Sequence, residues 1–329
     1  MAALRTEQVK VPADSPDWVD TGVLVEAGQC VTLLATGTAH PAGGPDSLTF
    51  QPHLFLCYRL APGGTFDKLA APTTSLVAAQ DGRLELVANF PGAWRDRQGT
   101  LDEAWPRPAA AGSYAVTVLV WRDAEHAADG LAALAPSDPL AGAERRRLLQ
   151  PARLPDGWAP VWRVGATEAY RDQGSSIDCC CENDGGLIVR AVDVPLTERT
   201  RLAWEWRVLS LPSAVAEDTL LTHDYLSIAV EFDNGLDLTY LWSSTLPTGT
   251  TFPCPLPWWN THETHHVVRS GTTELGRWLD ESQPVLADYA AAIGGPPPQR
   301  IVGIWLIAVA VFQGGRIECE YRNIQLCEL

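Results

Sequence analysis

Residues 202–208 read Leu-Ala-Trp-Glu-Trp-Arg-Val, and this stretch decides the fold class of the second half of the chain. Successive side chains of an extended strand point to opposite faces, so Leu202, Trp204, Trp206 and Val208 share one face. The small and charged residues of the stretch fall on the other face. We expect the first face to join an apolar core and the second to meet solvent or another layer of protein.

Short strand-like runs of this kind recur along the chain, separated by turn-forming residues. The 27 Gly and 25 Pro supply the turns that all-β folds need. The run 301–312 is apolar throughout, which predicts a central strand covered on both faces. The other predicted strands are residues 33–36, 54–58, 84–87, 114–120, 188–192, 226–232, 236–242 and 265–269.

Helical patterns are scarce and fall in two places. Residues 139–149 predict a short helix that begins after Asp138, a residue type that caps helices well. Residues 285–293 predict another, which Gly294 and Gly295 end. The sequence therefore predicts an all-β protein of two β-sandwich domains joined by a partly helical linker.

The length of the chain also indicates two domains. A chain of 329 residues exceeds an ordinary single core, and its strand pattern stops after Trp121 and resumes near Pro155. We predict domains at residues 1–122 and 155–329 with a linker at 123–154. Proteases should cut this linker first.

The net charge and the hydropathy of the chain disfavour several classes of binding partner. Lys and Arg number 24 against 40 Asp and Glu, a formal charge of −16, which disfavours nucleic acid and anionic membranes. The first residues lack the apolar core of a secretion signal, and no run of about 18 apolar residues occurs. We expect a soluble cytoplasmic protein with a small-molecule ligand. Its oligomeric state is left open.

The eight cysteines are expected to be reduced thiols in that compartment. The run Cys179-Cys180-Cys181 has no CxxC pair beside it to complete a zinc site, and adjacent cysteines on a strand point to opposite faces. The sequence also lacks a phosphate-binding loop, a G-x-S-x-G elbow and a dinucleotide fingerprint. We therefore expect no metal site and no cofactor.

The first half carries a pattern with a known counterpart. Residues 20–37 read Asp-Thr-Gly-Val-x-Val-x-Ala-Gly-x-x-Val-Thr-Leu-x-Ala-x-Gly, residues 89–94 read Asn-Phe-Pro-Gly-Ala-Trp, and residues 112–116 read Gly-Ser-Tyr-Ala-Val. Residues 18–121 thereby resemble PA-I-type galactose-binding lectins, which implies a small galactose-binding-like β-sandwich whose Pro-Gly loop contacts calcium and sugar. The ligating Asp of that family falls on Asn89, and two downstream Asn fall on Asp96 and Arg97. Because a guanidinium beside the cation position is unfavourable, we expect no tight calcium binding.

The second half resembles a bacterial family known as domain of unknown function 3047. The matching pieces, in order, are residues 202–208, 211–212, 223–225, 240–244, 267–271, 288–289 and 301–304. The resemblance implies a jelly-roll-like sandwich and no known activity. Where the family continues with an acidic Thr-Asp-Thr-Asp-Asn stretch, residues 308–313 are Ala-Val-Ala-Val-Phe-Gln, so a site lined by this strand should suit a less polar ligand.

Residues 261–266 hold three of the seven histidines and are the densest group of proton-transfer residues. On a strand, His262, Thr264 and His266 share one face, and Glu263 and His265 share the other. Because His titrates near neutral pH, His266 and His262 are candidate acid or base residues. The spacing does not match the H-E-x-x-H zinc signature, and the alternatives are a polar loop entering a strand or a metal site.

Asp224 is a further candidate for proton transfer, because it lies beside His223 and Tyr225 at the mouth of a strand. With Arg269 it forms either a structural ion pair or an acid and anion-anchor pair in a site. Thirteen Trp residues either stack on a ligand or fill a core. The predicted substrate contacts are Trp204, Trp206, Trp242, Trp258, Tyr225 and Phe312.

These features favour a cofactor-independent enzyme that acts on a small, largely apolar metabolite by acid/base chemistry, as a cyclase, isomerase, lyase or hydratase. The alternative is a noncatalytic protein that binds carbohydrate or another small ligand, which both resemblances and the Trp count favour. A scaffold without a ligand is the third possibility.

Overall fold

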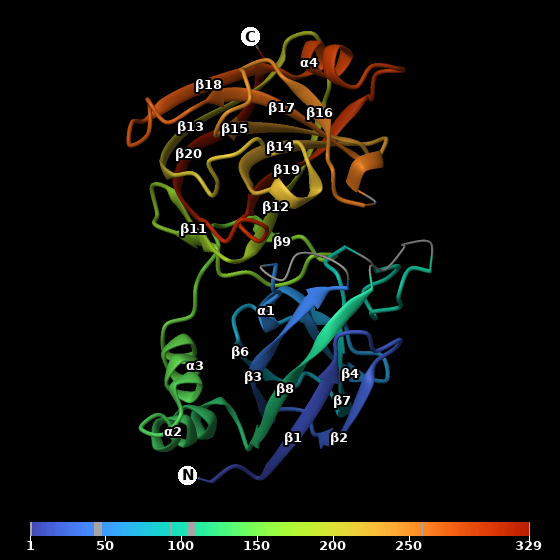
Figure 1. Ribbon diagram of the computed structural model, residues 1–329, viewed down its shortest axis with the longest axis vertical. Coiled ribbons are helices and arrows are strands. Elements are labelled where there is room, and N and C mark those ends of the chain that lie inside the picture. Colours follow the sequence, from blue (N-terminus) through green and yellow to red (C-terminus); the bar gives the residue numbers. More distant parts are fainter. Residues whose placement is uncertain (1, 43–47, 93, 104–108, 258, 329) are drawn as a thin grey trace. The chain divides into compact units, whose positions relative to one another are not determined.

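A computed structural model describes residues 2–42, 48–92, 94–103, 109–257 and 259–328 (Figure 1). The chain divides into two compact units. The first unit comprises residues 1–152 and 162–168, and the second comprises residues 153–161 and 169–329. Both consist mainly of antiparallel β-sheets, as the all-β prediction requires.

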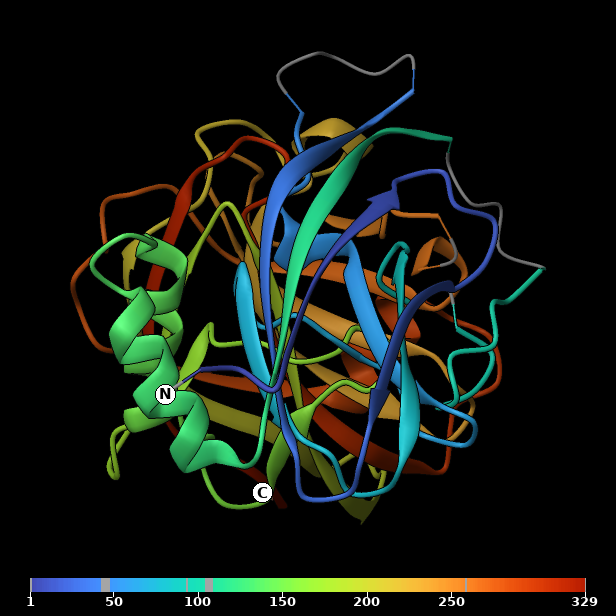
Figure 2. The same ribbon diagram turned by 90° about the horizontal axis from the view of Figure 1, so that it is seen from below.

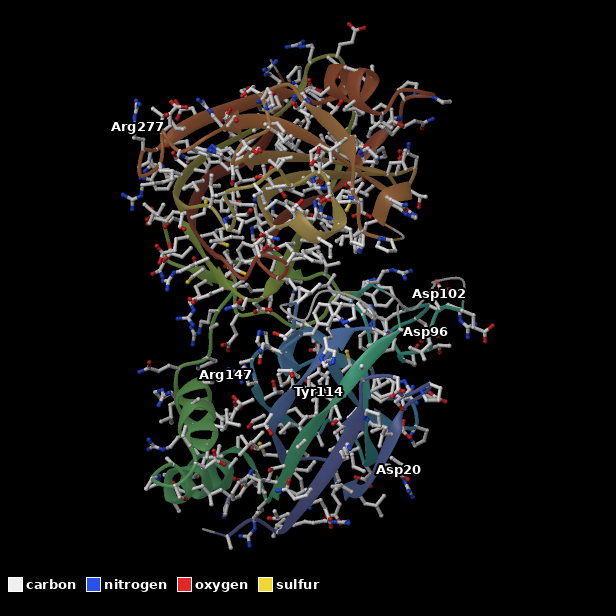
Figure 3. The ribbon with its side chains drawn as sticks, viewed as in Figure 1. Asp20, Asp96, Asp102, Tyr114, Arg147 and Arg277 are labelled. Carbon is white, nitrogen blue, oxygen red and sulfur yellow. The ribbon has the colours of Figure 1, made fainter. Side chains whose placement is uncertain are left out.

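The first unit contains two four-stranded antiparallel sheets. One sheet has the order β1 (Arg5–Pro12), β8 (Ala110–Trp121), β3 (Cys30–Pro41), β6 (Thr73–Val77), and the other β2 (Val19–Val25), β7 (Gly82–Ala88), β4 (Leu56–Ala61), β5 (Asp67–Lys68). Alternation along β8 buries Tyr114, Val116 and Val118 between the sheets, and the Tyr114 hydroxyl donates to the Phe50 carbonyl at 3.0 Å (Figure 3). Period-two patterning thus determines which side chains form this core.

One predicted strand begins later than expected. Residues 54–58 were predicted as a strand, but Pro52–Phe55 form the short helix α1 and β4 begins at Leu56. Pro52 in the first turn, with its fixed φ and missing N–H, favours this helical start.

Two helices follow β8 and cover the outer face of its sheet (Figure 2). They are α2 (Ala124–Leu134) and α3 (Pro139–Leu149), and Asp138 caps α3 by accepting from the Leu140 N–H at 2.9 Å, which confirms the predicted helix. A Cβ on Gly130 would lie 2.0 Å from the Trp121 ring, so only glycine permits this close approach. The predicted linker therefore contains two helices packed on the first unit.

Residues 162–168 return to the first unit after a short excursion into the second. The Gly92 N–H donates to the Arg163 carbonyl at 2.7 Å, and the Ala166 N–H donates to Asp67 at 2.8 Å. Arg147 of α3 pairs with Glu168 at 2.7 Å (Figure 3). The segment is thus an integral part of the first unit.

We predict that a fragment of residues 1–168 is more stable than a fragment of residues 1–152. The shorter fragment loses the Trp162 ring that packs on Phe66 and leaves the half-buried Asp67 without the Ala166 donor, a loss of about 2 kcal/mol. Urea unfolding of the two fragments measures the difference. Equal midpoints would show that the segment adds no stability.

The second unit contains a five-stranded and a seven-stranded sheet. The first has the order β10 (Tyr170–Asp172), β11 (Ile177–Glu182), β20 (Arg316–Glu328), β13 (Thr200–Ser210), β18 (Leu279–Pro284). The second has the order β16 (Thr251–Pro253), β17 (Glu263–Ser270), β15 (Asp237–Ser243), β14 (Tyr225–Phe232), β19 (Arg300–Val309), β12 (Gly185–Pro195), β9 (Trp158–Pro160). The predicted second helix is α4 (Val285–Ala292).

The core of the second unit lies between these sheets. Leu202, Trp204, Trp206 and Val208 of β13 are all buried in it, as the alternation predicts. The apolar run beginning at residue 301 is the central strand β19, buried on both faces. None of the helices among the described residues has the length and apolarity to span a membrane.

The seven-stranded sheet is also covered on the face that points away from this core. Ser227 of β14, Thr239 of β15 and Val267 of β17 lie on this face and are inaccessible to solvent. Neighbouring residues on the core face of β14 and β15, such as Ile228 and Tyr240, are inaccessible as well. The cover comes from the segments before β14 and around β16, including the turns η1 (Leu220–Thr222) and η2 (Trp259–Thr261). This covered outer face carries most of the buried polar residues of the unit.

Candidate functional site

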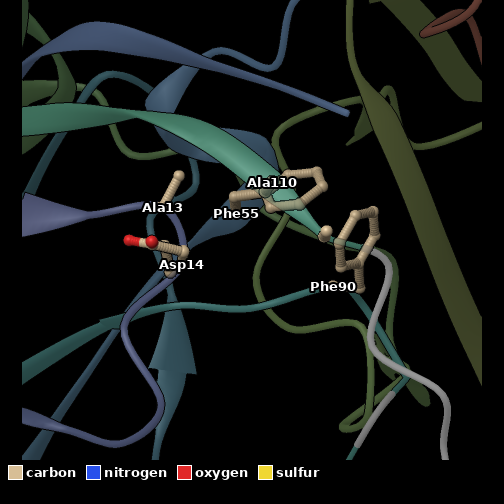
Figure 4. Close-up of a pocket in the computed structure, with 7 residues that line it drawn as sticks. Ala13, Asp14, Phe55, Phe90 and Ala110 are labelled. Carbon is tan, nitrogen blue, oxygen red and sulfur yellow. The ribbon is translucent and has the colours of Figure 1, made fainter. Parts of the chain in front are cut away.

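A pocket of about 170 Å³ lies at one end of the first unit (Figure 4). Its wall is formed by residues at the ends of β1, β7 and β8 and by the segment that leads into β4: Ala13, Asp14, Phe55, Ala88, Phe90, Ala109 and Ala110. The rings of Phe55 and Phe90 meet edge to face with centroids 4.3 Å apart. Asp14 is exposed and supplies the one carboxylate among these residues. The pocket thus combines two aromatic rings with a single carboxylate side chain.

The pocket adjoins the loop that carries the lectin resemblance. Asn89 is buried, and its N–H donates to the Phe55 carbonyl at 2.9 Å, so the backbone fixes Phe90 beside Phe55. Asp96 accepts from the Gln98 and Thr100 N–H groups, both at 3.0 Å. The Thr100 contacts hold the pKa of Asp96 below its usual value, so the carboxylate stabilises its own turn.

Arg97, the other position aligned with a calcium ligand, lies with its guanidinium 5.4 Å from the centre of the Trp162 ring. The positive charge of Arg97 is thus engaged in a cation–π contact with another residue of the first unit. The expectation of no tight calcium binding stays a prediction.

A group of buried polar side chains occupies the covered outer face of the seven-stranded sheet. Its members come from β14, β15, β17 and the segments that cover them: Glu217, His223, Asp224, Tyr225, Ser227, Asp237, Thr239, Ser243, Cys254, Glu263 and His265. Burial of polar groups costs free energy unless they are paired, so such a concentration indicates a specific role.

Two carboxylates of this group share one hydroxyl. The Thr239 hydroxyl lies 3.0 Å from Glu263 and 3.3 Å from Asp237, and the Tyr225 hydroxyl donates to Glu263 at 3.1 Å. Burial raises the pKa of both carboxyls, and the charge of Glu263 raises that of Asp237 further. Because the Thr239 hydroxyl carries one proton, it can donate to only one of the two carboxyls at a time.

His223, Cys254 and His265 form a compact subgroup beside Glu263. The Cys254 Sγ lies 3.5 Å from His223 Nε2, and His265 Nε2 lies 3.5 Å from Glu263 Oε1. Burial lowers the pKa of His223 to about 4 and holds that of His265 well below its usual value. Both imidazoles are therefore neutral at pH 7.

Asp224 has structural partners. Its two oxygens accept from three consecutive backbone N–H groups after β19, those of Val311 (2.7 Å), Phe312 (2.8 Å) and Gln313 (2.6 Å). Burial raises the pKa of Asp224, and these three bonds oppose that shift. The carboxylate therefore fixes the loop between β19 and β20. Phe312, a predicted ligand contact, binds Asp224 through its backbone N–H.

Arg269 forms ion pairs with two glutamates and not with Asp224. Its guanidinium contacts Glu281 at 2.6 Å and Glu274 at 2.9 Å. The predicted pair of Asp224 and Arg269 is therefore not formed, because Arg269 pairs with Glu274 and Glu281 and Asp224 accepts from backbone N–H groups.

His266 and His262 lie apart from the buried subgroup. His266 points to the opposite face of β17 from His265, as the alternation predicts, with its ring 6.0 Å from that of Tyr240. The Tyr240 hydroxyl donates to Asp288 at 3.1 Å, and burial raises the pKa of this carboxyl. His262 precedes β17, with Nδ1 2.9 Å from the Thr261 hydroxyl. Their catalytic role stays a prediction.

The predicted tryptophan contacts lie in the core. Trp204, Trp206 and Trp242 are at most 2% exposed, and successive ring centroids are 5.5 and 5.4 Å apart. Their rings pack against protein on all sides, which gives them a core role. Tyr225 is the predicted contact that lies in the buried polar group. Trp258 lies outside the described residues.

Residue types alone did not single out the buried subgroup. His265 and Glu263 were visible as one face of a strand, and His223 as the neighbour of Asp224, but the preference went to His266 and His262. Cys254 lies between two prolines in a segment with no periodic pattern. Its place beside His223 depends on the turn that follows β16, which local sequence does not show.

Comparisons with solved structures find neighbours of low sequence identity and low TM-score. The EclA N-terminal domain, a PllA-like lectin, shares 20% identity over 35% of this chain and 95% of its own, with a TM-score of 0.26. The xyloglucanase domain of NopAA, a type three effector from Sinorhizobium fredii, in complex with cellobiose shares 8% identity over 49% of this chain and 86% of its own, with a TM-score of 0.32.

A carbohydrate-binding module of the β-sandwich superfamily shares 10% identity, with full coverage of both chains and a TM-score of 0.22. Comparison with curated proteins finds no match.

The second half of the chain matches a family model. The model described as protein of unknown function DUF3047 covers residues 156–325, which is more than half of the 329 residues and includes every motif quoted for the second half. The chain belongs to the DUF3047 family.

Proposed function

We propose that this protein binds a small saccharide without catalysis, at the pocket of the first unit. The observation that carries the proposal is the position of that pocket: its wall includes Phe90, within the Asn89–Trp94 motif that resembles the ligand loop of a lectin family. Asp14 adds a carboxylate across from the aromatic rings (Figure 4).

The chemistry of the wall suits a single sugar ring. A pyranose has an apolar face of C–H groups, which packs on an aromatic side chain, and an edge of hydroxyl groups, which donate to a carboxylate. The volume of about 170 Å³ is below the range of about 300–1,000 Å³ that drug-sized ligands occupy, so one ring is the largest fit.

We expect the affinity for a monosaccharide to be modest and independent of calcium. One exposed carboxylate and one partly exposed ring support a dissociation constant of about 1 mM, because exposed contacts each contribute little. Asp96 accepts hydrogen bonds within its own loop, and Arg97 contacts the Trp162 ring. We therefore expect Asp14 and Phe90 to make the contacts with the sugar.

We predict that Asp14→Ala and Phe90→Ala each weaken binding of methyl galactoside about tenfold, the value of one charged hydrogen bond or one ring contact. Saturation-transfer NMR on the full chain, with and without calcium, measures this affinity. Asp129→Ala is the matched control, since Asp129 is an exposed acid on α2. Wild-type binding by all three variants would contradict the site, and no binding of any monosaccharide by wild type would contradict the function.

The enzyme hypothesis for the second unit stays a separate prediction, with His266 and His262 as its remaining proton-transfer candidates. Asp224 and Arg269 already have structural partners. Turnover of a small metabolite that His266→Ala abolishes, in protein with unchanged melting behaviour, would support that hypothesis over binding alone.

A further inference from the structure

We propose that His223, Cys254 and His265 bind a structural Zn²⁺ ion in the second unit, with Glu263 as the fourth ligand. The ligand atoms of the first three residues all lie within 4.8 Å of one another, and all three side chains are buried. They come from three separate segments: the residue after η1, the residue after β16, and the middle of β17. This site is independent of saccharide binding in the first unit.

The spacing of sulfur and nitrogen fits a tetrahedral ion. A Zn–S bond of about 2.3 Å and a Zn–N bond of about 2.0 Å place the two donors about 3.5 Å apart at the tetrahedral angle. Cys254 Sγ and His223 Nε2 are 3.5 Å apart. Small side-chain rotations close the longest separation of 4.8 Å to the same range.

A backbone carbonyl fixes the ring of His223 in the tautomer that a metal needs. Its Nδ1 lies 2.5 Å from the Glu217 carbonyl oxygen, which accepts a proton and cannot donate one. The Nδ1 atom is therefore the donor, and the neutral ring leaves a lone pair on Nε2 toward Cys254. Histidine ligands to metals commonly donate their other N–H to a carbonyl in this way.

His265 gives an independent indication of a ligand. It is fully buried, and neither ring nitrogen has a hydrogen-bond partner among the residues that the structure describes. Its Nε2 approaches Glu263 at 3.5 Å without the alignment of a hydrogen bond. A buried imidazole with two unsatisfied nitrogens is costly, and a bond to a metal satisfies one of them.

The charges of the four residues balance a divalent cation. A Cys254 thiolate and a Glu263 carboxylate together neutralise Zn²⁺, so the ion requires no further counter-charge in the buried layer. Tyr225 and Thr239 hydroxyls already orient the Glu263 carboxylate. When the ion binds, it displaces the thiol proton, which passes to solvent.

A thiol–imidazole nucleophile is the competing use of the same pair. That chemistry needs a reactive thiolate open to substrate, whereas Cys254 and His223 are both inaccessible to solvent. Burial and the neighbouring Glu263 raise the pKa of the Cys254 thiol. A closed, four-ligand metal site needs no substrate access, so the burial favours a structural ion.

Metal analysis of the full chain tests the proposal. Protein purified without chelator and dialysed exhaustively should carry about one zinc per chain by mass spectrometry. Removal of zinc by a chelator should lower the melting temperature by about 5–10 °C, and added Zn²⁺ should restore it. Co²⁺ added to the metal-free protein should give the visible bands of a tetrahedral site and a thiolate charge-transfer band.

Substitutions of single residues identify which side chains bind the zinc ion. Cys254→Ser should remove the charge-transfer band, and His265→Ala should reduce bound zinc at least tenfold, whereas Cys180→Ser, at an exposed thiol, should keep both signals. Circular dichroism identifies any variant that fails to fold, and the cobalt spectrum of wild type then decides alone. Folded wild-type protein that binds neither metal, or a Cys254→Ser variant with the wild-type cobalt spectrum, would overturn the proposal. Saccharide binding should survive zinc removal, so failure of one proposal leaves the other intact.

Discussion

Trp206→Ala should lower the free energy of unfolding of the second unit by about 3–5 kcal/mol. The ring is inaccessible to solvent, lies 5.4 Å from Trp242 and 5.5 Å from Trp204 between centroids, and donates from Nε1 to Glu281 at 3.1 Å. Alanine leaves a large cavity and removes one donor from a buried carboxylate. Urea unfolding followed by circular dichroism measures the loss.

Trp278→Ala is the matched control. Trp278 is half-buried on the outer side of the five-stranded sheet, with the Arg322 guanidinium 4.0 Å from its centroid, and its loss should cost about 1 kcal/mol or less. A Trp206→Ala protein with the urea midpoint of wild type would contradict the core assignment and return Trp206 to the list of ligand contacts.

Asp224→Asn should destabilise the protein by about 2–4 kcal/mol. The carboxylate accepts from three backbone N–H groups at 2.6–2.8 Å, and an amide has one oxygen to offer, so its NH₂ group must face a donor. The loop between β19 and β20 should loosen as a result. Urea unfolding reports the stability, and hydrogen exchange at Val311, Phe312 and Gln313 reports the loop.

Asp193→Asn provides the comparison for this substitution. Asp193 forms an exposed surface pair with Arg300, and its loss should change stability by less than about 1 kcal/mol. Equal stabilities of the two variants would contradict the structural role of Asp224 and would favour the original interpretation of this residue as a proton carrier.

Local sequence predicted those elements whose pattern is complete within a few residues. Alternation at 202–208 identified the face of β13 that joins the core, and continuous apolar character identified β19 as a central strand. Asp138 predicted the start of α3, because capping depends on the side chain and the next two or three N–H groups. Strand alternation, apolar runs and helix caps each depend on residues close together in the sequence, so they can be recognised without knowledge of long-range contacts.

Features that depend on long-range packing were not predicted. The outer face of the seven-stranded sheet is covered by its own connecting segments, so polar residues such as Thr239 and Glu263 are buried although strand alternation marks them as an outward face. The same cover brings Cys254 to His223 across 31 positions of sequence. The return of residues 162–168 to the first unit is equally a product of tertiary contacts.

His265 and His266 are neighbours in sequence but differ in burial, and local sequence does not show this difference. Alternation separated the two histidines correctly, but it gave no indication of which face would be fully buried. His266 and His262 were preferred because the face that they share carries two imidazoles, which can line a pocket. The structure instead concentrates its buried polar groups on the face of His265.

The most direct test of the proposed function is a chemical-shift map of the isotopically labelled full chain, titrated with methyl galactoside. The proposal predicts shifts confined to the amides that line the pocket, which saturate together at millimolar ligand: Ala13, Asp14, Phe55, Ala88, Phe90, Ala109 and Ala110. Saturating shifts centred on the second unit, or none at any monosaccharide concentration, would contradict it.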